Sequence, residues 1–413
     1  MNVFLFILYF LALLFVIYVL QKKIGGGLNS FTVSSIYGYK VLLGCLYGLV
    51  FFHAYGGDDT WIFFRDSVSE YHKMIHDPRN FFYDFSPANE FSGTKSLFSS
   101  FRLYLYDLEY WTMRKLLAFF NIFSRGNYYI DVLFFDFLVF WGPFLLYRLT
   151  TGFYPLKKRI LVAVIFFLPG PTFWLSGIRG DGLLFGFFCL TIYFTSTWLR
   201  GAKLKYLLPI VLGIGGMLVF RSAFLLILFP AFLAWLVAVM NPARSIHVFA
   251  AIYTIAAILF FLSPLIPKTQ GGLPQVVADR QLDFYKLPGK TVFGLDTLRP
   301  TLGGFVRLAP EAAANGFFRP LPWETHGILQ MFSSFDCLIF IVFLVLPWVF
   351  PGQHWVKSLT SPLSLFYIAF GTSLILFIGY VVPFPGAIVR YKAIPEMLLI
   401  ATCVIASRKP FKL

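Results

Sequence analysis

The sequence contains little charge. Only 13% of its 413 residues are Asp, Glu, Lys or Arg, and 58% are hydrophobic. Soluble domains have about 25% charged and about 45–50% apolar residues. The composition therefore excludes a soluble globular fold and predicts a chain that places most of its surface in lipid.

Cysteine is also scarce, and all of the cysteines lie inside apolar runs, at Cys45, Cys189, Cys337 and Cys403. This placement is typical of small buried side chains and predicts neither a disulfide framework nor a metal cluster. The sequence also lacks a P-loop, a dinucleotide fingerprint, a nucleophile elbow and a CxxC pair. Its motifs therefore give no support to ATP-driven transport, nicotinamide chemistry or an elbow-type hydrolase.

Apolar runs long enough to cross a bilayer recur along the whole chain. They predict an all-α polytopic integral membrane protein, a single membrane domain over 1–413 with about 11 transmembrane helices. The candidate spans are 3–20, 34–54, 129–147, 160–177, 182–199, 206–220, 222–240, 248–265, 336–350, 362–382 and 393–407.

The placement of charge predicts the orientation. The net charge is +15, and basic residues without acidic neighbours gather in alternate short loops, as at Lys157, Lys203 and Arg244. By the positive-inside rule these loops are cytoplasmic, so the N-terminus lies outside and the C-terminus lies in the cytoplasm. The first run lacks a basic leader and a small-residue cleavage site, which predicts an anchor. Because topology accounts for the positive charge, no nucleic-acid partner is expected.

Two predicted outer segments are long. In 55–128, apolar residues such as Phe64, Val68 and Tyr71 recur at helical spacing, which predicts helices lying in the membrane interface. The segment 266–335 is rich in proline and glycine, so we expect an ordered loop or a small cap there.

The first candidate site is a pair of adjacent carboxylates. Asp58 and Asp59 follow the second span in the run Gly56–Thr60. Ionising both is costly, so one is expected to stay protonated or to bind a cation. The alternative is a solvated turn that only ends a helix. Arg65 and Asp66 follow within two helical turns and are candidates to orient the pair.

A second candidate site consists of cations near the outer ends of spans, namely Arg179, Arg221, Arg390 and Lys392. Charge at that depth usually has a partner, and the arginine fork suits a phosphate. Asp181 is a supporting residue beside the first of these cations. The alternatives are contact with lipid headgroups or pairing with Asp131 and Asp136. A carboxylate as deep in the third span as Asp136 needs a partner, and one of the arginines is the expected one.

Two further groups carry weaker signals. Arg319, Trp323 and Glu324 share a proline-stiffened segment, which suits either a sugar or a loop anchored at the membrane interface. His72 and His76 share a helix face, but the sequence lacks the HExxH pattern. We therefore expect an interfacial helix there rather than a metal site.

The layout resembles that of the C-type glycosyltransferase superfamily, multi-spanning enzymes that use polyprenyl-phosphate-linked sugars. The likeness lies in Asp58 and Asp59 at the start of a long outer loop, in arginines at outer span ends and in a later outer loop. Segments 173–179 and 390–391 also resemble those of bacterial envelope-glycan membrane proteins. The family's acidic loop usually follows the first span, whereas here it follows the second. The resemblance implies that Asp58 or Asp59 is the catalytic base or orients the acceptor.

The resulting hypothesis is sugar transfer from a polyprenyl-phosphate donor to an envelope glycan, lipid or protein acceptor at the outer face of a bacterial inner membrane. Arg179, Arg221 and Arg390, with Lys392, would hold the donor phosphate, and a carboxylate would deprotonate the acceptor hydroxyl. No nucleotide is needed, and a divalent cation and the oligomeric state stay open. The alternatives are an oligosaccharide polymerase or ligase with a lipid-pyrophosphate donor, and a non-enzymatic lipid or glycolipid transporter.

Overall fold

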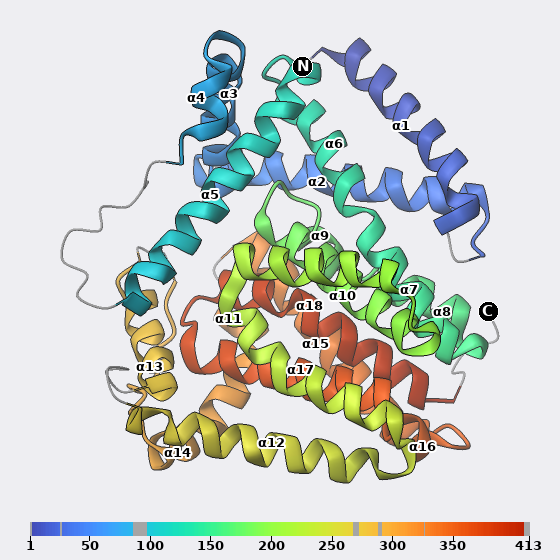
Figure 1. Ribbon diagram of the computed structural model, residues 1–413, viewed down its shortest axis with the longest axis vertical. Helices are drawn as coiled ribbons and strands as arrows, with labels where there is room; N and C mark the ends of the chain where they lie inside the picture. Colours follow the sequence, from blue (N-terminus) through green and yellow to red (C-terminus); the bar gives the residue numbers. More distant parts are fainter. Residues whose placement is uncertain are drawn as a thin grey trace. The chain divides into compact units, whose positions relative to one another are not determined.

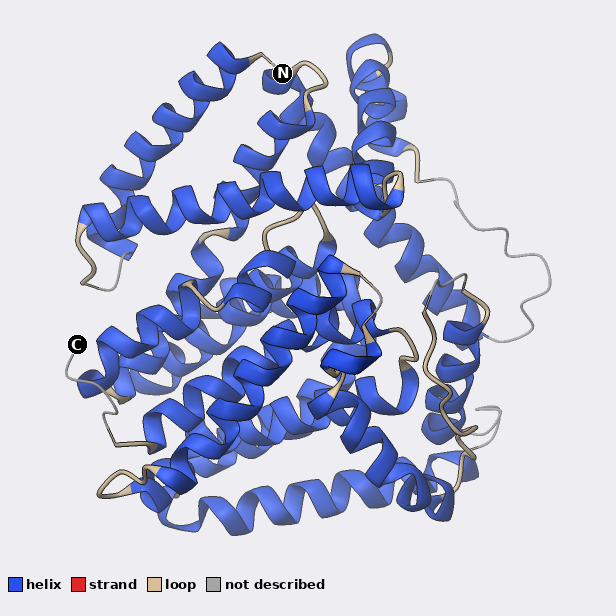
Figure 2. Ribbon diagram, turned by 180° about the vertical axis from the view of Figure 1, so that it is seen from behind, coloured by secondary structure: helices blue, strands red, loops and turns tan. Residues whose placement is uncertain are grey.

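The computed structural model describes residues 2–24, 27–85, 97–266, 272–287, 291–325 and 327–408. Every regular element in these ranges is a helix, as the ribbon views show (Figure 1, Figure 2). The prediction of an all-α chain is therefore confirmed.

Eight helical segments in the described ranges are long and apolar enough to cross a membrane. They are Val3–Gln21, Ser30–Tyr55, Tyr128–Phe153, Gly180–Gly201, Leu204–Met240, Pro242–Leu265, Ile328–Val349 and Pro362–Val381. These helices support a multi-pass membrane protein, while the number of eleven spans and the orientation stay predictions.

Two of the predicted spans lie on one element. Segments 206–220 and 222–240 both belong to α11 (Leu207–Met240). The backbone of α11 leaves the helical region at Arg221, with φ −160° and ψ 90°. The sequence prediction therefore placed a boundary where the structure has an interruption inside a longer helix.

Two other predicted spans are not among the eight segments. The run 160–177 divides into α8 (Lys158–Phe166) and α9 (Pro169–Trp174), because proline cannot continue the helical hydrogen-bond pattern. The run 393–407 lies in α18 (Pro385–Ala406), a longer helix that begins before the predicted span. Charged side chains in the first half of α18 make it more polar than the eight apolar segments.

The chain divides into two compact units, while the single membrane domain over 1–413 stays a prediction. Unit 1 comprises Met1–Lys158, Ile165–Phe167 and Thr172–Ser222, and unit 2 comprises Arg159–Val164, Leu168–Pro171 and Ala223–Leu413. The main helices of unit 1 are α1 (Val3–Ile24), α2 (Ser30–Tyr55), α3 (Asp59–His76), α4 (Pro78–Tyr83), α5 (Leu97–Ser124), α6 (Tyr128–Val139), α7 (Trp141–Phe153) and α10 (Gly180–Gly201). In unit 1, α3 packs on α5, α2 on α6 and α7 on α10.

The described part of the predicted outer segment 55–128 is mostly helical, because it contains α3, α4 and α5. Buried polar contacts join α3 to α5. Asn121 donates to the Ser67 hydroxyl at 2.9 Å, and Arg114 donates to the buried Glu70 at 3.3 Å. The helical part of this prediction is thus confirmed, and its place in the membrane interface stays a prediction.

Unit 2 is also helical, and α17 (Pro362–Val381) packs on α18. Its main helices are α12 (Ser245–Leu262), α13 (Gly272–Tyr285), α14 (Leu302–Ala313), α15 (Ile328–Val349), α16 (Trp355–Leu359), α17 (Pro362–Val381) and α18. The predicted cap 266–335 contains α13, α14 and a π-helical turn, so it is more helical than its proline and glycine content indicated. The ring of Trp235 stacks on that of Phe366, with centroids 5.1 Å apart, in the core of unit 2.

Candidate functional site

The glycine pair before Asp58 reverses the chain between α2 and α3. Gly56 and Gly57 have φ values of +70° and +95°, a region that L side chains rarely adopt. The N–H groups of both glycines donate to carbonyls of the last turn of α2, which closes that helix. The turn therefore delivers the two acidic residues at the start of α3.

Both acidic residues lie at the N-terminal end of α3. The side chain of Asp58 caps the helix and accepts the Thr60 N–H at 3.0 Å, and Asp59 is the first residue of α3. Unpaired N–H groups and the helix dipole favour negative charge at this end. The Asp58 side chain is 20% exposed and that of Asp59 is 59% exposed, so Asp59 is the more accessible carboxylate.

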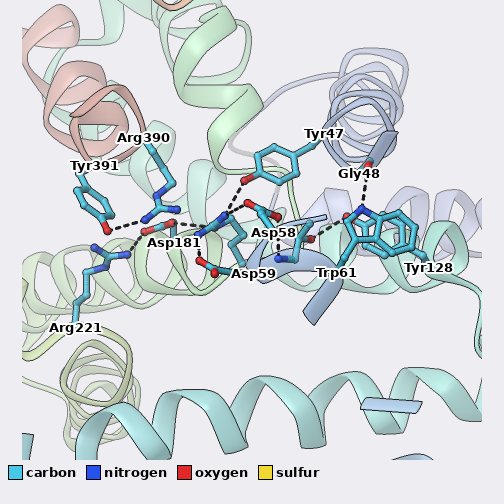
Figure 3. A network of polar contacts seen from close by, with 12 residues as sticks. Tyr47, Gly48, Asp58, Asp59, Trp61, Tyr128, Asp181, Arg221, Arg390 and Tyr391 are labelled. Atoms are coloured by element: carbon cyan, nitrogen blue, oxygen red, sulfur yellow. Dashed lines mark hydrogen bonds and ion pairs between the residues drawn. The ribbon is translucent and has the colours of Figure 1, made fainter. Parts of the chain in front are cut away.

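The residues after the acidic pair fix its position on unit 1. The Trp61 indole donates to the Gly48 carbonyl at 2.9 Å, and its ring stacks on Tyr128 with centroids 4.1 Å apart. The Thr60 and Tyr128 hydroxyls are 2.9 Å apart and hydrogen-bonded. Figure 3 shows Trp61 between Gly48 and Tyr128. The start of α3 is thereby held against both α2 and α6.

Arg179 joins the acidic pair to the loop before α10. Its Nη1 donates to Asp58 and, at 3.0 Å, to the Tyr47 hydroxyl, and its Nη2 donates to Asp59. Burial alone lowers the pKa of Arg179, but Tyr47 and the nearby carboxylates outweigh burial and raise that pKa well above its usual value. The guanidinium therefore stays charged where it contacts the two carboxylates.

Glycines bring the Arg179 loop close to its neighbours. A Cβ atom on Gly177 would lie 2.5 Å from Cδ1 of Tyr47, and one on Gly180 would lie 2.6 Å from Oε1 of Glu109. Larger residues at these positions would push the loop away. Sequence reasoning missed Tyr47 and Glu109, since nothing in the local pattern links them to residues more than 70 positions away.

Asp181 and Arg221 extend the same line of charges. Arg221 donates to Asp181 Oδ1 at 2.8 Å, and Arg179 Nε lies 3.8 Å from Asp181 Oδ2. The residues Asp58, Asp59, Arg179, Asp181 and Arg221, hereafter the charge ladder, thus alternate in sign and all belong to unit 1 (Figure 3). Arg221, with a side chain 32% exposed, is the more accessible of the two cations.

A buried charge pair supports the backbone that leads to Arg179. Lys40 Nζ lies 3.4 Å from Asp136 Oδ1 and donates to the Leu175 carbonyl at 2.7 Å. Gly44 makes room for the pair, because a Cβ atom there would lie 2.5 Å from Asp136 Oδ2. The expectation that an arginine neutralises Asp136 is therefore corrected, since its partner is Lys40. A lysine inside an apolar run was the sequence signal for this pair.

The residues predicted to orient the acidic pair make other contacts. Arg65 donates to the Trp61 carbonyl at 3.3 Å, and Asp66 accepts the Tyr110 hydroxyl at 2.6 Å. Burial and this hydrogen bond raise the pKa of Tyr110 to about 12. Asp66 therefore connects α3 to α5. It supports the site but does not belong to the charge ladder.

The other predicted cations lie in unit 2. Arg390 donates to the Tyr391 hydroxyl at 2.6 Å and stacks on that ring. Arg319 pairs with Glu324 at 2.9 Å, and Trp323 beside them is 77% exposed. This arrangement keeps both interpretations of the segment open, a sugar contact and an interfacial anchor.

Lys392 occupies a different environment from the one predicted for it. Its side chain is fully buried, and Nζ donates to the Arg319 carbonyl at 3.2 Å and to Cys337 Sγ at 3.4 Å. A lysine with internal partners and no exposed surface is poorly placed to meet a lipid phosphate. Its position indicates a structural or electrostatic role inside unit 2.

The described residues contain no group of three His, Cys, Asp or Glu side chains arranged to hold a metal ion. The requirement for a divalent cation consequently stays open and enters no step of the chemistry below.

No family model matches the sequence, and neither a curated protein nor a solved structure matches it. The resemblance to C-type glycosyltransferases therefore stays a hypothesis based on layout. The charge ladder is the feature on which a functional proposal can be built.

Proposed function

We propose that the chain is a membrane glycosyltransferase that takes a sugar from a polyprenyl-phosphate donor at the outer face of a bacterial inner membrane. The observation that carries this proposal is the charge ladder, in which an accessible carboxylate and an accessible guanidinium are linked through buried Arg179. The acceptor is an envelope glycan, lipid or protein. Such a reaction needs a base for the acceptor and a cation for the leaving phosphate.

Asp59 is the proposed base because its carboxylate contacts Arg179 and is largely exposed. The acceptor hydroxyl proton passes to Asp59 while the acceptor oxygen bonds to the anomeric carbon. The bond from that carbon to the phosphate oxygen breaks, and polyprenyl phosphate leaves with the electron pair. Arg221 stabilises the charge that develops on this phosphate. Asp58, which caps α3, positions Asp59 rather than reacting.

A second candidate function is lipid or glycolipid transport, and one observation favours it. The α11 backbone is interrupted at Arg221, and transporters often bind charged substrates at broken helices. In a transporter Arg221 would contact the lipid phosphate, but Asp59 would have no proton to accept. An oligosaccharide polymerase or ligase would also use Arg221 to contact the phosphate of its lipid donor.

Substitution of the acidic residues separates these functions. Envelope glycans and polyprenyl-linked sugars are measured by mass spectrometry in cells that produce Asp59→Asn, Asp58→Asn or the control Asp296→Asn, an exposed acid of unit 2. We expect Asp59→Asn to lose product by about 10²-fold or more at normal abundance, and Asp58→Asn to lose less. Full product from Asp59→Asn would remove it as the base and favour transport.

A further inference from the structure

Unit 2 buries three ionisable side chains that the proposed reaction does not use. Asp336 on α15 is 4% exposed, and Lys392 and Glu396 on α18 are not exposed at all. Lys392 and Glu396 are four residues apart and share one face of α18, and α15 packs directly on α18. Because charge without water is costly, the charges of these three groups must nearly cancel.

Hydrogen bonding distinguishes the two acids. Asp336 Oδ1 accepts the Gly170 N–H at 3.1 Å, and glycine is required there because a Cβ atom would lie 2.5 Å from that oxygen. In the part of the chain that the structure describes, neither carboxyl oxygen of Glu396 has a hydrogen-bond partner. An N–H donor stabilises a carboxylate, so Asp336 is the better anion of the two.

The surroundings supply no further balancing charge among the described residues. The charged groups that act on Glu396 are Asp336 and Lys392. Of the other helices packed on α18, α17 contains no Asp, Glu, Lys or Arg, and Lys357 of α16 is exposed. Cys337 of α15 accepts from Lys392. One ammonium and two carboxyl groups are neutral together only when one carboxyl group carries a proton.

We propose that Glu396 is a proton-binding site. It is a neutral carboxylic acid beside Asp336 and Lys392, whose opposite charges balance each other. The ligand is a single proton on a carboxyl oxygen. Since water must reach Glu396 before the proton can leave, any conformational change that hydrates this face of α18 is coupled to proton release. This inference is independent of the proposed glycosyltransferase function.

The test compares unfolding midpoints of the full chain in detergent at neutral pH. Glu396→Gln keeps a neutral side chain of the same shape, so we expect little change in the midpoint. Asp336→Asn leaves Lys392 without its anion and should lower the midpoint clearly, while the double variant Asp336→Asn with Lys392→Met should recover most of the loss. A loss from Glu396→Gln as large as that from Asp336→Asn would overturn the proposal, because Glu396 would then be the anion.

Chemical modification provides a second readout. Dicyclohexylcarbodiimide adds to a protonated carboxyl group in apolar surroundings: the acid proton goes to a carbodiimide nitrogen and the carboxyl oxygen bonds to the central carbon. We expect peptide mass spectrometry to find the adduct on Glu396 and not on Asp336, and to lose it in Glu396→Gln. Modification of Asp336 but not of Glu396 would show that the proton lies on Asp336, which would contradict the proposal.

Discussion

The guanidinium of Arg179 donates to Asp59 and thereby links a buried cation to a carboxylate that is 59% exposed. The two residues are 120 positions apart in the sequence. Their contact fixes the direction of the Asp59 side chain without hiding it from an acceptor. The remaining Nη atom holds Asp58, so both acids depend on the same buried side chain.

Loss of Arg179 should therefore destabilise unit 1. Arg179→Gln leaves Asp58 and Asp181 without a buried partner, and breaking such a pair costs about 3–5 kcal/mol. Arg179→Lys keeps the charge but cannot contact two carboxylates with a planar fork, so we expect an intermediate loss. Thermal unfolding in detergent measures both variants. Wild-type stability of Arg179→Gln would show that the contacts of Arg179 do not hold the acidic turn.

The glycine turn gives a second prediction. Gly57→Ala places a side chain at φ +95° and only 3.0 Å from Arg65 Nη2, and left-handed backbone costs a non-glycine residue about 1–2 kcal/mol. We expect a lower unfolding free energy together with lower activity, because Asp58 and Asp59 follow this turn. The matched control is Gly152→Ala in α7, where the new Cβ atom meets nothing within 4 Å. Equal stability of the two variants would refute the prediction.

The buried pair of Lys40 and Asp136 gives a third prediction. Lys40→Met leaves Asp136 as an uncompensated buried acid, so the unfolding midpoint should fall. Adding Asp136→Asn should restore part of the loss, since both charges are then absent. A double variant less stable than Lys40→Met would mean that the pair is not the main role of Lys40. In that case its hydrogen bond to the Leu175 carbonyl would be the more important contact.

Tyr110 gives a prediction about pH. Its pKa in the folded chain is about 12, whereas an unfolded tyrosine has a pKa of about 10. Between pH 10 and pH 12 the folded state therefore binds one more proton than the unfolded state. The contribution of Tyr110 to folding stability is thus fully present below pH 10 and falls as the pH rises through 12. Unfolding midpoints of wild type and Tyr110→Phe should differ most at neutral pH and converge toward pH 12. A difference between the two midpoints that stays constant across that pH range would contradict the raised pKa of Tyr110.

The sequence predicted the all-α fold and the members of the charge ladder, because charge in an apolar chain is rare enough to be noticed. It did not predict that Asp58, Asp59 and Arg179 contact one another, since their pairing depends on how distant helices pack. The pairing of Lys40 with Asp136 could not be predicted from the positive-inside rule, because that rule considers loops and not the interiors of spans. The burial of Lys392 could not be predicted for a related reason, since sequence position near a span end does not reveal whether a side chain is buried.

The most direct test of the glycosyltransferase proposal is mass spectrometry of the lipids that remain bound to the protein purified from its own host. We predict a polyprenyl-phosphate sugar in the wild type, more of it in Asp59→Asn because transfer is blocked, and its loss in Arg221→Ala. The control Arg65→Ala should keep the wild-type lipids. Bulk phospholipid alone, unchanged in all of these variants, would contradict the assignment of the charge ladder to an anionic lipid donor.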